Sequence, residues 1–132
     1  MTQQQTKKRI DAEALARICA EAADEKKAEN VVVINVGVAT LVADYFVICG
    51  GTSGPHLRAI SDWVIRKLRT GNSIRPLAVD GKSDTDWVVI DYGAVMVHIL
   101  SPEARERYSL ESLWGDAPRL PAAFVGRCPQ KQ

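Results

Sequence analysis

The sequence predicts an α/β fold, with a mixed β-sheet of about five strands and flanking helices. Segments with helical spacing of apolar residues alternate with short β-branched runs, and the last two strand-like segments form a tight hairpin. Composition agrees with a globular domain, since 46% of the residues are apolar and 25% are charged. The length of 132 residues suits a single domain. We expect that domain at 11–114, a flexible N-terminus at 1–10 and a mobile C-terminal tail at 115–132.

The first helix and the first two strands follow from local patterns. Apolar or small residues repeat at helical spacing through 11–27, and Asp11 is a suitable N-cap for that helix. The β-branched run at 31–36 predicts a strand. A second strand is expected at 44–49, and it leads directly into the turn Gly50-Gly51-Thr52-Ser53-Gly54-Pro55.

The second helix begins after that turn. Ser53 is its expected N-cap, Pro55 suits its first turn, and Gly71 is expected to end it. Its buried face is predicted to carry Leu57, Ile60, Val64 and Leu68.

The remaining elements lie on either side of the hairpin. A strand at 74–79 contains Pro76, which favours an edge position because proline cannot donate a ladder hydrogen bond. After the hairpin, a short helix is expected from Ser101 to about Tyr108, followed by a partly helical segment at 110–114.

The stretch 87–100 predicts a β-hairpin whose register follows from its turn. Gly93-Ala94 fits a two-residue type II′ turn, with glycine first. This turn pairs Tyr92 with Val95, Asp91 with Met96, Ile90 with Val97, Val89 with His98 and Val88 with Ile99. Because paired residues share a face, the first face carries Val88, Ile90, Tyr92, Val95, Val97 and Ile99. The second face carries Trp87, Val89, Asp91, Met96, His98 and Leu100, and the clean separation favours this register.

Asp91 and His98 share the second face as diagonal neighbours, and three interpretations of them stay open. They form a hydrogen-bonded buried pair under a helix, they belong to an exposed docking surface, or they act as a catalytic pair. Their neighbours Trp87 and Met96 are compatible with docking, because large apolar side chains with a few polar groups typify interface hot spots. No motif places a serine or cysteine nucleophile near the pair, so these two residues alone do not define an active site.

The charge balance and the cysteines limit the classes of partner and the compartment. Lys and Arg number 17 and Asp and Glu number 16, a formal net charge of +1, and the basic clusters at 7–9 and 66–69 are short. We therefore expect little direct RNA contact, because binding driven by phosphate neutralisation needs a clear basic excess.

Three cysteines without disulfide-like or zinc-like spacing, and no apolar stretch of membrane-spanning length, indicate a cytoplasmic protein without membrane contact. We predict no metal, no cofactor and no catalytic residue.

The turn Gly50–Pro55 lies between a strand and a helix, where backbone N–H groups could bind an anion. It matches neither of the two common phosphate-binding fingerprints. It is similar to the glycine–serine turn of nucleotidyltransferases, which also need carboxylates on the neighbouring strand to hold Mg²⁺. The candidates Asp84, Asp86 and Asp91 are not convincingly spaced, because the first two precede the strand and the third ends it. Plain strand-to-helix geometry is the favoured interpretation, and a nucleotidyl- or phosphotransferase is the alternative.

Several sequence blocks together resemble a known family. They are D-Y-F-V-I-C-G-G-T-S-G-P-H, A-I-S-D-W-V, D-G-K-S-D-T-D-W-V-V-I-D-Y-G-A-V-M-V-H-I-L and R-E-R-Y-S-L-E-S-L-W-G-D-A-P. In this order and spacing they resemble the ribosomal silencing factor family, also called RsfS or Iojap-like, over roughly Asp11 to Pro118.

The resemblance implies a nucleotidyltransferase-like topology without the catalytic set, and a function as a translation repressor. Members bind ribosomal protein fourteen of the large subunit and so block association with the small subunit. The family's docking surface falls on Trp87, Asp91 and Tyr92, with His98 and Tyr108 nearby, and Val89 and Met96 complete the predicted set. A large-subunit assembly factor would use the same contact and stays an alternative. A homodimer is also expected, from apolar surface on the hairpin and tail.

Two positions depart from the family pattern. Ala94 stands where an acidic residue is common after the turn glycine, and this change could remove a contact to a basic ribosomal surface. Asp80 stands where glutamate usually precedes glycine, which is a conservative change.

Overall fold

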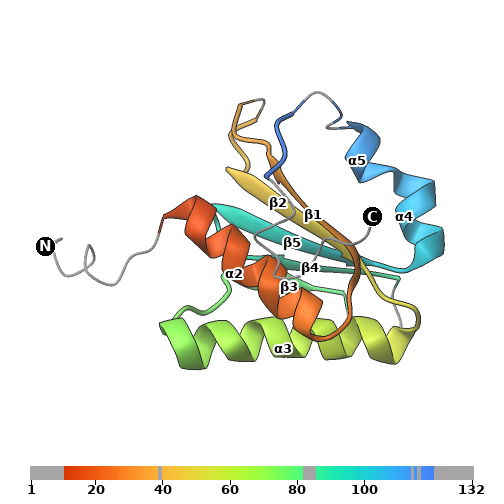
Figure 1. The fold of residues 1–132 in the computed structure, drawn as a ribbon, viewed down its shortest axis with the longest axis horizontal. Coiled ribbons are helices and arrows are strands. Elements are labelled where there is room, and N and C mark those ends of the chain that lie inside the picture. Colours follow the sequence, from red (N-terminus) through yellow and green to blue (C-terminus); the bar gives the residue numbers. More distant parts are fainter. Residues whose placement is uncertain (1–10, 39, 82–85, 114, 116, 121–132) are drawn as a thin grey trace, which may run out of the picture.

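The fold is a five-stranded mixed sheet with helices on both faces (Figure 1). The computed structural model describes residues 11–38, 40–81, 86–113, 115 and 117–120. The strands are β1 (Glu29–Asn35), β2 (Tyr45–Gly50), β3 (Ala78–Asp80), β4 (Trp87–Asp91) and β5 (Val95–Leu100). Their order in the sheet is β1-β2-β5-β4-β3, with β2 and β5 parallel and the other neighbours antiparallel. The predicted α/β class with a mixed sheet of five strands is confirmed.

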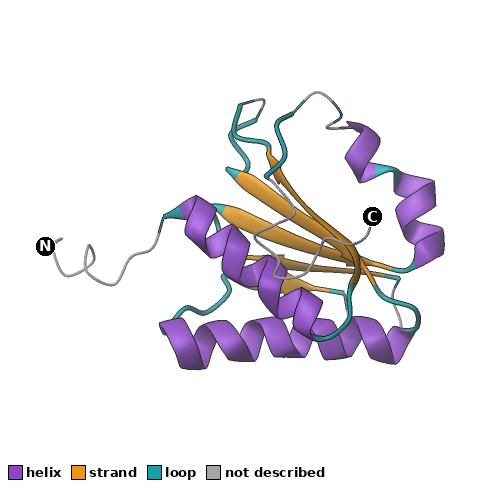
Figure 2. Ribbon diagram, viewed as in Figure 1, coloured by secondary structure: helices purple, strands orange, loops and turns teal. Residues whose placement is uncertain are grey.

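Two long helices cover one face of the sheet, and two short helices lie against the other (Figure 2). The long ones are α2 (Ala12–Glu25) and α3 (Gly54–Asn72), and the short ones are α4 (Pro102–Tyr108) and α5 (Leu110–Leu113). Side-chain oxygens cap the first three helices in chain order. Asp11 accepts from the Ala14 N–H at 2.8 Å, Ser53 from the His56 N–H at 3.2 Å, and Ser101 from the Ala104 N–H at 3.0 Å. None of the helices in the described ranges combines the length and the hydrophobicity needed to cross a lipid bilayer.

The apolar side chains form two cores, one on each face of the sheet. The helix-face core joins α2 and α3 to the sheet, and its sheet residues include Val33, Val47, Val88, Ile90, Val97 and Ile99. The second-face core is smaller and contains Ile34, Val36, Ala43, Phe46, Ile48, Leu100 and Ala104. Cys19 and Cys49 are free thiols buried in the helix-face core. The second face is therefore the less completely covered one.

The hairpin register agrees with the sequence prediction at every pair within the strands. Asp91 lies opposite Met96, Ile90 opposite Val97, Val89 opposite His98 and Val88 opposite Ile99. The Tyr92 N–H donates to the Val95 carbonyl at 2.9 Å across the turn. Gly93 has φ +88°, a conformation that favours glycine, as the first position of a type II′ turn requires.

The predicted end of α3 at Gly71 is wrong. The helix continues to Asn72, and Ser73 follows it in the left-handed conformation, with φ 57°. The Ile74 N–H then donates to the Leu68 carbonyl at 3.1 Å, and the Ile74 side chain packs on the helix-face core. The chain must leave the helix where Ile74 can reach the core, and this tertiary contact outweighs the local preference for glycine.

The third strand is at the edge of the sheet, as predicted, but it is shorter than 74–79. It contains Ala78–Asp80, and Pro76 lies outside it. The first N–H that bonds toward β4 belongs to Leu77, which donates to the Asp91 carbonyl at 2.7 Å. Pro76 has no N–H to add to this ladder, which accounts for the short strand.

The segment after α5 lies along the outer edge of β1. The Asn35 N–H donates to the Pro118 carbonyl at 2.8 Å, and the Leu120 N–H donates to the Val33 carbonyl at 3.0 Å. Ala117 packs on the second-face core and Leu120 on the helix-face core, so this segment crosses the sheet edge. The expected mobile tail thus begins with residues bonded to the sheet. Residues 121–132 and the N-terminal residues 1–10 lie outside the described ranges.

Replacing Ser73 by glycine should raise the free energy of unfolding by about 0.5–1 kcal/mol, because glycine adopts the left-handed conformation without a steric penalty. The matched variant Ser53→Ala removes the N-cap of the same helix and should lower it by about 1 kcal/mol. Urea unfolding of both variants measures these changes. A loss of stability in Ser73→Gly would contradict the assigned role of Ser73.

Candidate docking surface

Trp87 is the centre of a group of aromatic side chains on the second face. It begins β4 and is half-buried. Its indole Nε1–H donates to His98 Nδ1 at 3.1 Å, and its ring lies 4.7 Å from the ring of Tyr108, between centroids. Tyr108 ends α4 and is 47% exposed. We call the partly exposed residues Trp87, Val89, Asp91, Met96 and Tyr108 the Trp87 surface.

His98 is the buried support of this surface. Only 5% of the residue is exposed, and its ring lies 4.5 Å from the Phe46 ring and 5.9 Å from the Trp87 ring. Because Nδ1 accepts the Trp87 hydrogen, the neutral ring carries its own hydrogen on Nε2, for which the described structure contains no hydrogen-bond partner. Burial lowers the pKa of His98 to about 4. The imidazole is therefore neutral near pH 7 and acts as a hydrogen-bond acceptor for Trp87.

Asp91 is not a partner of His98. Its carboxylate accepts from the Gly93 N–H at 2.8 Å and so stabilises the turn. The interpretation of a hydrogen-bonded Asp91–His98 pair is therefore wrong, because each side chain is bonded to another group. The same geometry removes the contact on which a catalytic pair would depend.

Tyr92 does not belong to the Trp87 surface. Its side chain packs in the helix-face core, where only 9% of the residue is exposed. Desolvation by burial raises the pKa of its phenol, and its hydroxyl has no hydrogen-bond partner in the described structure. The hairpin alternation already places Tyr92 on that face, so a docking role for its side chain does not fit the structure.

The short helices cover part of the second face and leave the Trp87 surface open. Ala104 of α4 is buried in the second-face core, and Leu110 of α5 packs against it. Val89, Asp91 and Met96 stay half-buried. The structure thus brings five predicted residues to one partly exposed surface and keeps His98 beneath Trp87.

Two N–H groups of the glycine turn after β2 donate within the chain, and the turn's Ser53 caps α3. Gly51 donates to the Leu100 carbonyl at 3.0 Å, Thr52 to His56 Nδ1 at 2.9 Å, and His56 to Ser53 Oγ at 3.2 Å. A Cβ on Gly51 would lie 2.7 Å from a Leu57 methyl carbon. These contacts give the glycine and the N–H groups structural roles, in agreement with plain strand-to-helix geometry.

The carboxylates of the enzyme alternative are spread along β4. Trp87, Leu100 and Gly50 form one row across the sheet, so Asp86 lies at the end where the glycine turn is. Asp91 lies five residues after Asp86, about 16 Å further along the strand direction. Asp84 falls outside the described residues. Among the described residues, no group of three or more His, Cys, Asp or Glu side chains is placed to share a metal ion.

Two residues of the site were not predicted from the sequence. Phe46 of β2 contacts His98 because β2 and β5 are parallel neighbours, and the sequence does not specify that pairing. Arg105 holds α4 and α5 through its ion pair with Glu111. The spacing R-x-x-Y-x-L-E was visible in the sequence, but nothing local indicates that its arginine and glutamate meet.

The family assignment follows from a match along almost the whole chain. The family model described as "Ribosomal silencing factor during starvation", RsfS, matches residues 9–131. The chain belongs to the ribosomal silencing factor family. The predicted resemblance is thereby confirmed.

Relatives of the RsfS family with similar sequences come from bacteria and mitochondria. A ribosomal silencing factor RsfS from Halalkalibacterium halodurans is 39% identical over 106 residues, which cover 80% of this chain and 90% of that protein. The mouse protein named "Mitochondrial assembly of ribosomal large subunit protein 1" is 35% identical over 95 residues, 68% of this chain and 40% of that protein. A crystal structure of a Chromobacterium violaceum protein has a TM-score of 0.76 at 22% identity, covers 92% of both chains and shares the fold.

The stability of this RsfS-family protein should fall as the pH drops from about 6.5 to about 4. In that window the unfolded chain, with an ordinary histidine pKa of 6.5, binds a proton that folded His98 does not accept. Above pH 6.5 this proton uptake does not occur, and the free energy of unfolding has its full value. By about pH 4 the uptake has lowered the free energy of unfolding by roughly 3 kcal/mol.

Urea unfolding of the wild type and of His98→Gln, at about pH 7 and about pH 4.5, measures this effect. The variant retains every carboxylate and His56, so the difference between the two proteins isolates His98. Equal acid destabilisation of both proteins would show that folded His98 titrates normally.

Proposed function

We propose that this protein is a non-enzymatic translation repressor that binds the large ribosomal subunit through ribosomal protein fourteen. Bound there, it blocks association with the small subunit sterically. Membership of the ribosomal silencing factor family supports the general role. The Trp87 surface is the part of the molecule that we assign to the contact.

The contact between Trp87 and Tyr108 is the observation that carries this assignment. Tryptophan and tyrosine dominate interface hot spots, because they combine a large apolar area with few rotatable bonds. Trp87 is held by its hydrogen bond to His98 and by the Tyr108 ring. A side chain already fixed in one conformation loses less conformational entropy on binding, so this surface is preorganised for docking.

The charge of the chain is compatible with a protein partner. A formal net charge of +1 provides little driving force for neutralising RNA phosphates. Docking on a ribosomal protein instead requires shape complementarity and a few anchoring side chains. The expected cytoplasmic location and homodimer stay predictions.

Trp87→Ala should weaken binding to isolated large subunits by about 2 kcal/mol or more, which is about 30-fold in Kd, because it removes the central aromatic anchor. Co-sedimentation with purified large subunits measures the affinity. The matched control is Trp63→Ala, since Trp63 is a half-buried tryptophan on α3, which covers the opposite face of the sheet. Unchanged affinity of Trp87→Ala, or an equal loss in Trp63→Ala, would contradict the assigned surface.

A nucleotidyltransferase activity is the competing proposal, and the geometry gives it little support. The Gly51 and Thr52 N–H groups of the glycine turn donate within the chain, and Asp91 lies at the far end of β4 from Asp86. We expect no saturable increase in Tm when Mg²⁺ and nucleoside triphosphate are added, because neither would find a built site. Thermal unfolding across a nucleotide titration tests this expectation, and a clear saturable stabilisation would favour the enzyme.

A role in assembly of the large subunit has one observation in its favour. The mouse relative carries that role in its name. An assembly factor would use the same surface and differ in the particle it binds, an incomplete large subunit rather than a finished one. Co-sedimentation with finished large subunits therefore also separates the two roles.

A further inference from the structure

The short helix α4 presents Tyr108 to Trp87 although little of α4 is buried. In its seven residues only Ala104 is buried. The following helix, α5, has four residues. Helices this short are not stable by themselves, so contacts with the rest of the chain must fix the orientation of α4.

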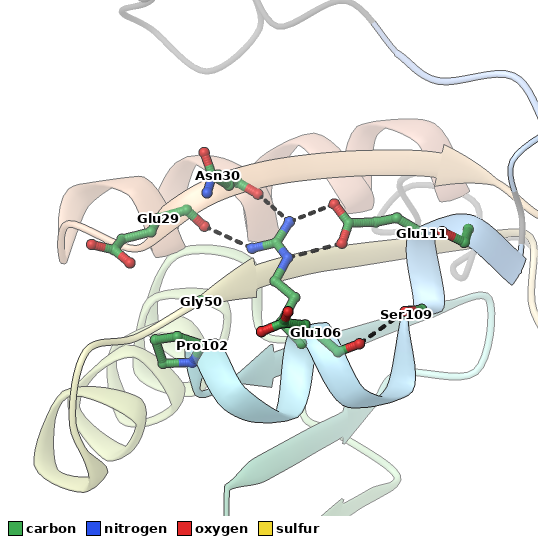
Figure 3. Close-up of a pocket in the computed structure, with 9 residues that line it drawn as sticks. Glu29, Asn30, Gly50, Pro102, Glu106, Ser109 and Glu111 are labelled. Carbon is green, nitrogen blue, oxygen red and sulfur yellow. Dashed lines mark hydrogen bonds and ion pairs between the residues drawn. The ribbon is translucent and has the colours of Figure 1, made fainter.

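Arg105 supplies such contacts on the same face of the sheet, at the start of β1 (Figure 3). Its Nε and Nη2 donate to the two carboxylate oxygens of Glu111 at 2.9 and 2.8 Å. Nη1 donates to the Glu29 carbonyl at 3.1 Å, and Nη2 also donates to the Asn30 carbonyl at 2.6 Å. One side chain thus joins α4, α5 and the start of β1.

The surroundings of Arg105 strengthen these bonds. The side chains of Arg105 and Glu111 are only 14% and 29% exposed, and the paired geometry is the strong bidentate form. The Arg105 guanidinium holds the pKa of Glu111 below its ordinary value.

The positions of these contacts explain how Arg105 can act on Tyr108. α4 contacts β4 through Tyr108 and β1 through Arg105, and β2 and β5 lie between those strands. Three strand spacings separate the two contacts, about 14 Å. Two attachment points so far apart fix the direction of a short helix, which a single buried alanine cannot do.

We propose that Arg105, paired with Glu111, is a positioning residue for the docking surface, because it holds α4 so that Tyr108 lies against Trp87. The hollow beside it, about 350 Å³ and lined by Glu29, Asn30, Pro102, Glu106 and Ser109 among others, is part of this arrangement. Arg105 makes four hydrogen bonds within the chain there, so its guanidinium group has a structural role. The inference rests on the proposed function, since it assigns Arg105 a role in the same surface.

The test compares Arg105→Gln and Glu111→Gln with the wild type in two measurements. The first is ¹⁹F NMR of protein labelled with fluorotryptophan, in which the Trp87 resonance is assigned by its loss in Trp87→Phe. We expect the Trp87 resonance to shift or broaden in both variants and the Trp63 resonance to stay unchanged. The second is co-sedimentation with large subunits, where we expect affinity to fall on the order of tenfold, about 1.4 kcal/mol.

The matched control is Arg17→Gln. Arg17 also pairs with a glutamate, Glu13, but on α2, and their side chains are 38% and 46% exposed. This variant should leave both the Trp87 resonance and the affinity at wild-type values. Measurements are made well below the Tm of each variant, so a general loss of stability does not produce the expected pattern.

The outcomes separate this inference from the proposed function. Folded Arg105→Gln and Glu111→Gln with wild-type Trp87 resonances and affinities would overturn the positioning role. If Arg105→Gln does not fold, the milder Glu111→Gln decides, and failure of both to fold would assign the pair to stability alone and overturn the proposal. The NMR measurement needs no ribosome, so a wild type that does not bind large subunits would contradict only the proposed function.

Discussion

The two-residue turn at Gly93-Ala94 determines where every hairpin side chain of the docking surface lies. It sets the register of β4 against β5, and β5 is the central strand that also pairs with β2. A shift of one residue would exchange the two faces, moving Trp87 and His98 toward α2 and α3 and the apolar set toward solvent. Asp91 contributes to the surface and also stabilises the turn, because its carboxylate accepts the Gly93 N–H. The same few residues therefore fix both the sheet and the site.

The support of Trp87 combines favourable contacts with one unfavourable feature. The His98 ring packs against Phe46 and accepts the indole hydrogen, and aromatic pairs of this kind contribute about 0.5–1.5 kcal/mol each. Its Nε2–H has no partner in the described structure, which costs about 1–3 kcal/mol. A core selected for stability alone would favour an apolar residue at this position. Retention of the imidazole agrees with a role in holding a partly exposed tryptophan, since local exceptions of this kind are expected at functional sites.

The sequence was sufficient for features that depend on local patterns. The helix caps at Asp11 and Ser53, the short helix that starts at Ser101 and the register of the hairpin follow from short motifs, and the structure agrees with them. Features that depend on contacts between distant segments could not be predicted. The end of α3 is set by Ile74 reaching the core, the contact of Phe46 with His98 depends on the parallel pairing of β2 and β5, and the Arg105 bonds to β1 span about 75 residues of chain. The hairpin register gives the shared face of Asp91 and His98 but not the groups that compete for their hydrogen bonds, so the sequence could not decide whether the two side chains pair.

We propose that this RsfS-family protein blocks the joining of ribosomal subunits by occupying the large subunit. Light scattering of purified subunits tests it most directly, because joined particles scatter more strongly than separate ones. The protein is added to large subunits before or after the small subunits. We expect saturating protein added first to lower the joined fraction strongly, and protein added after joining to act more slowly, since it must wait for the subunits to dissociate. If saturating protein added first left the joined fraction unchanged, this result would contradict the proposed block of subunit joining.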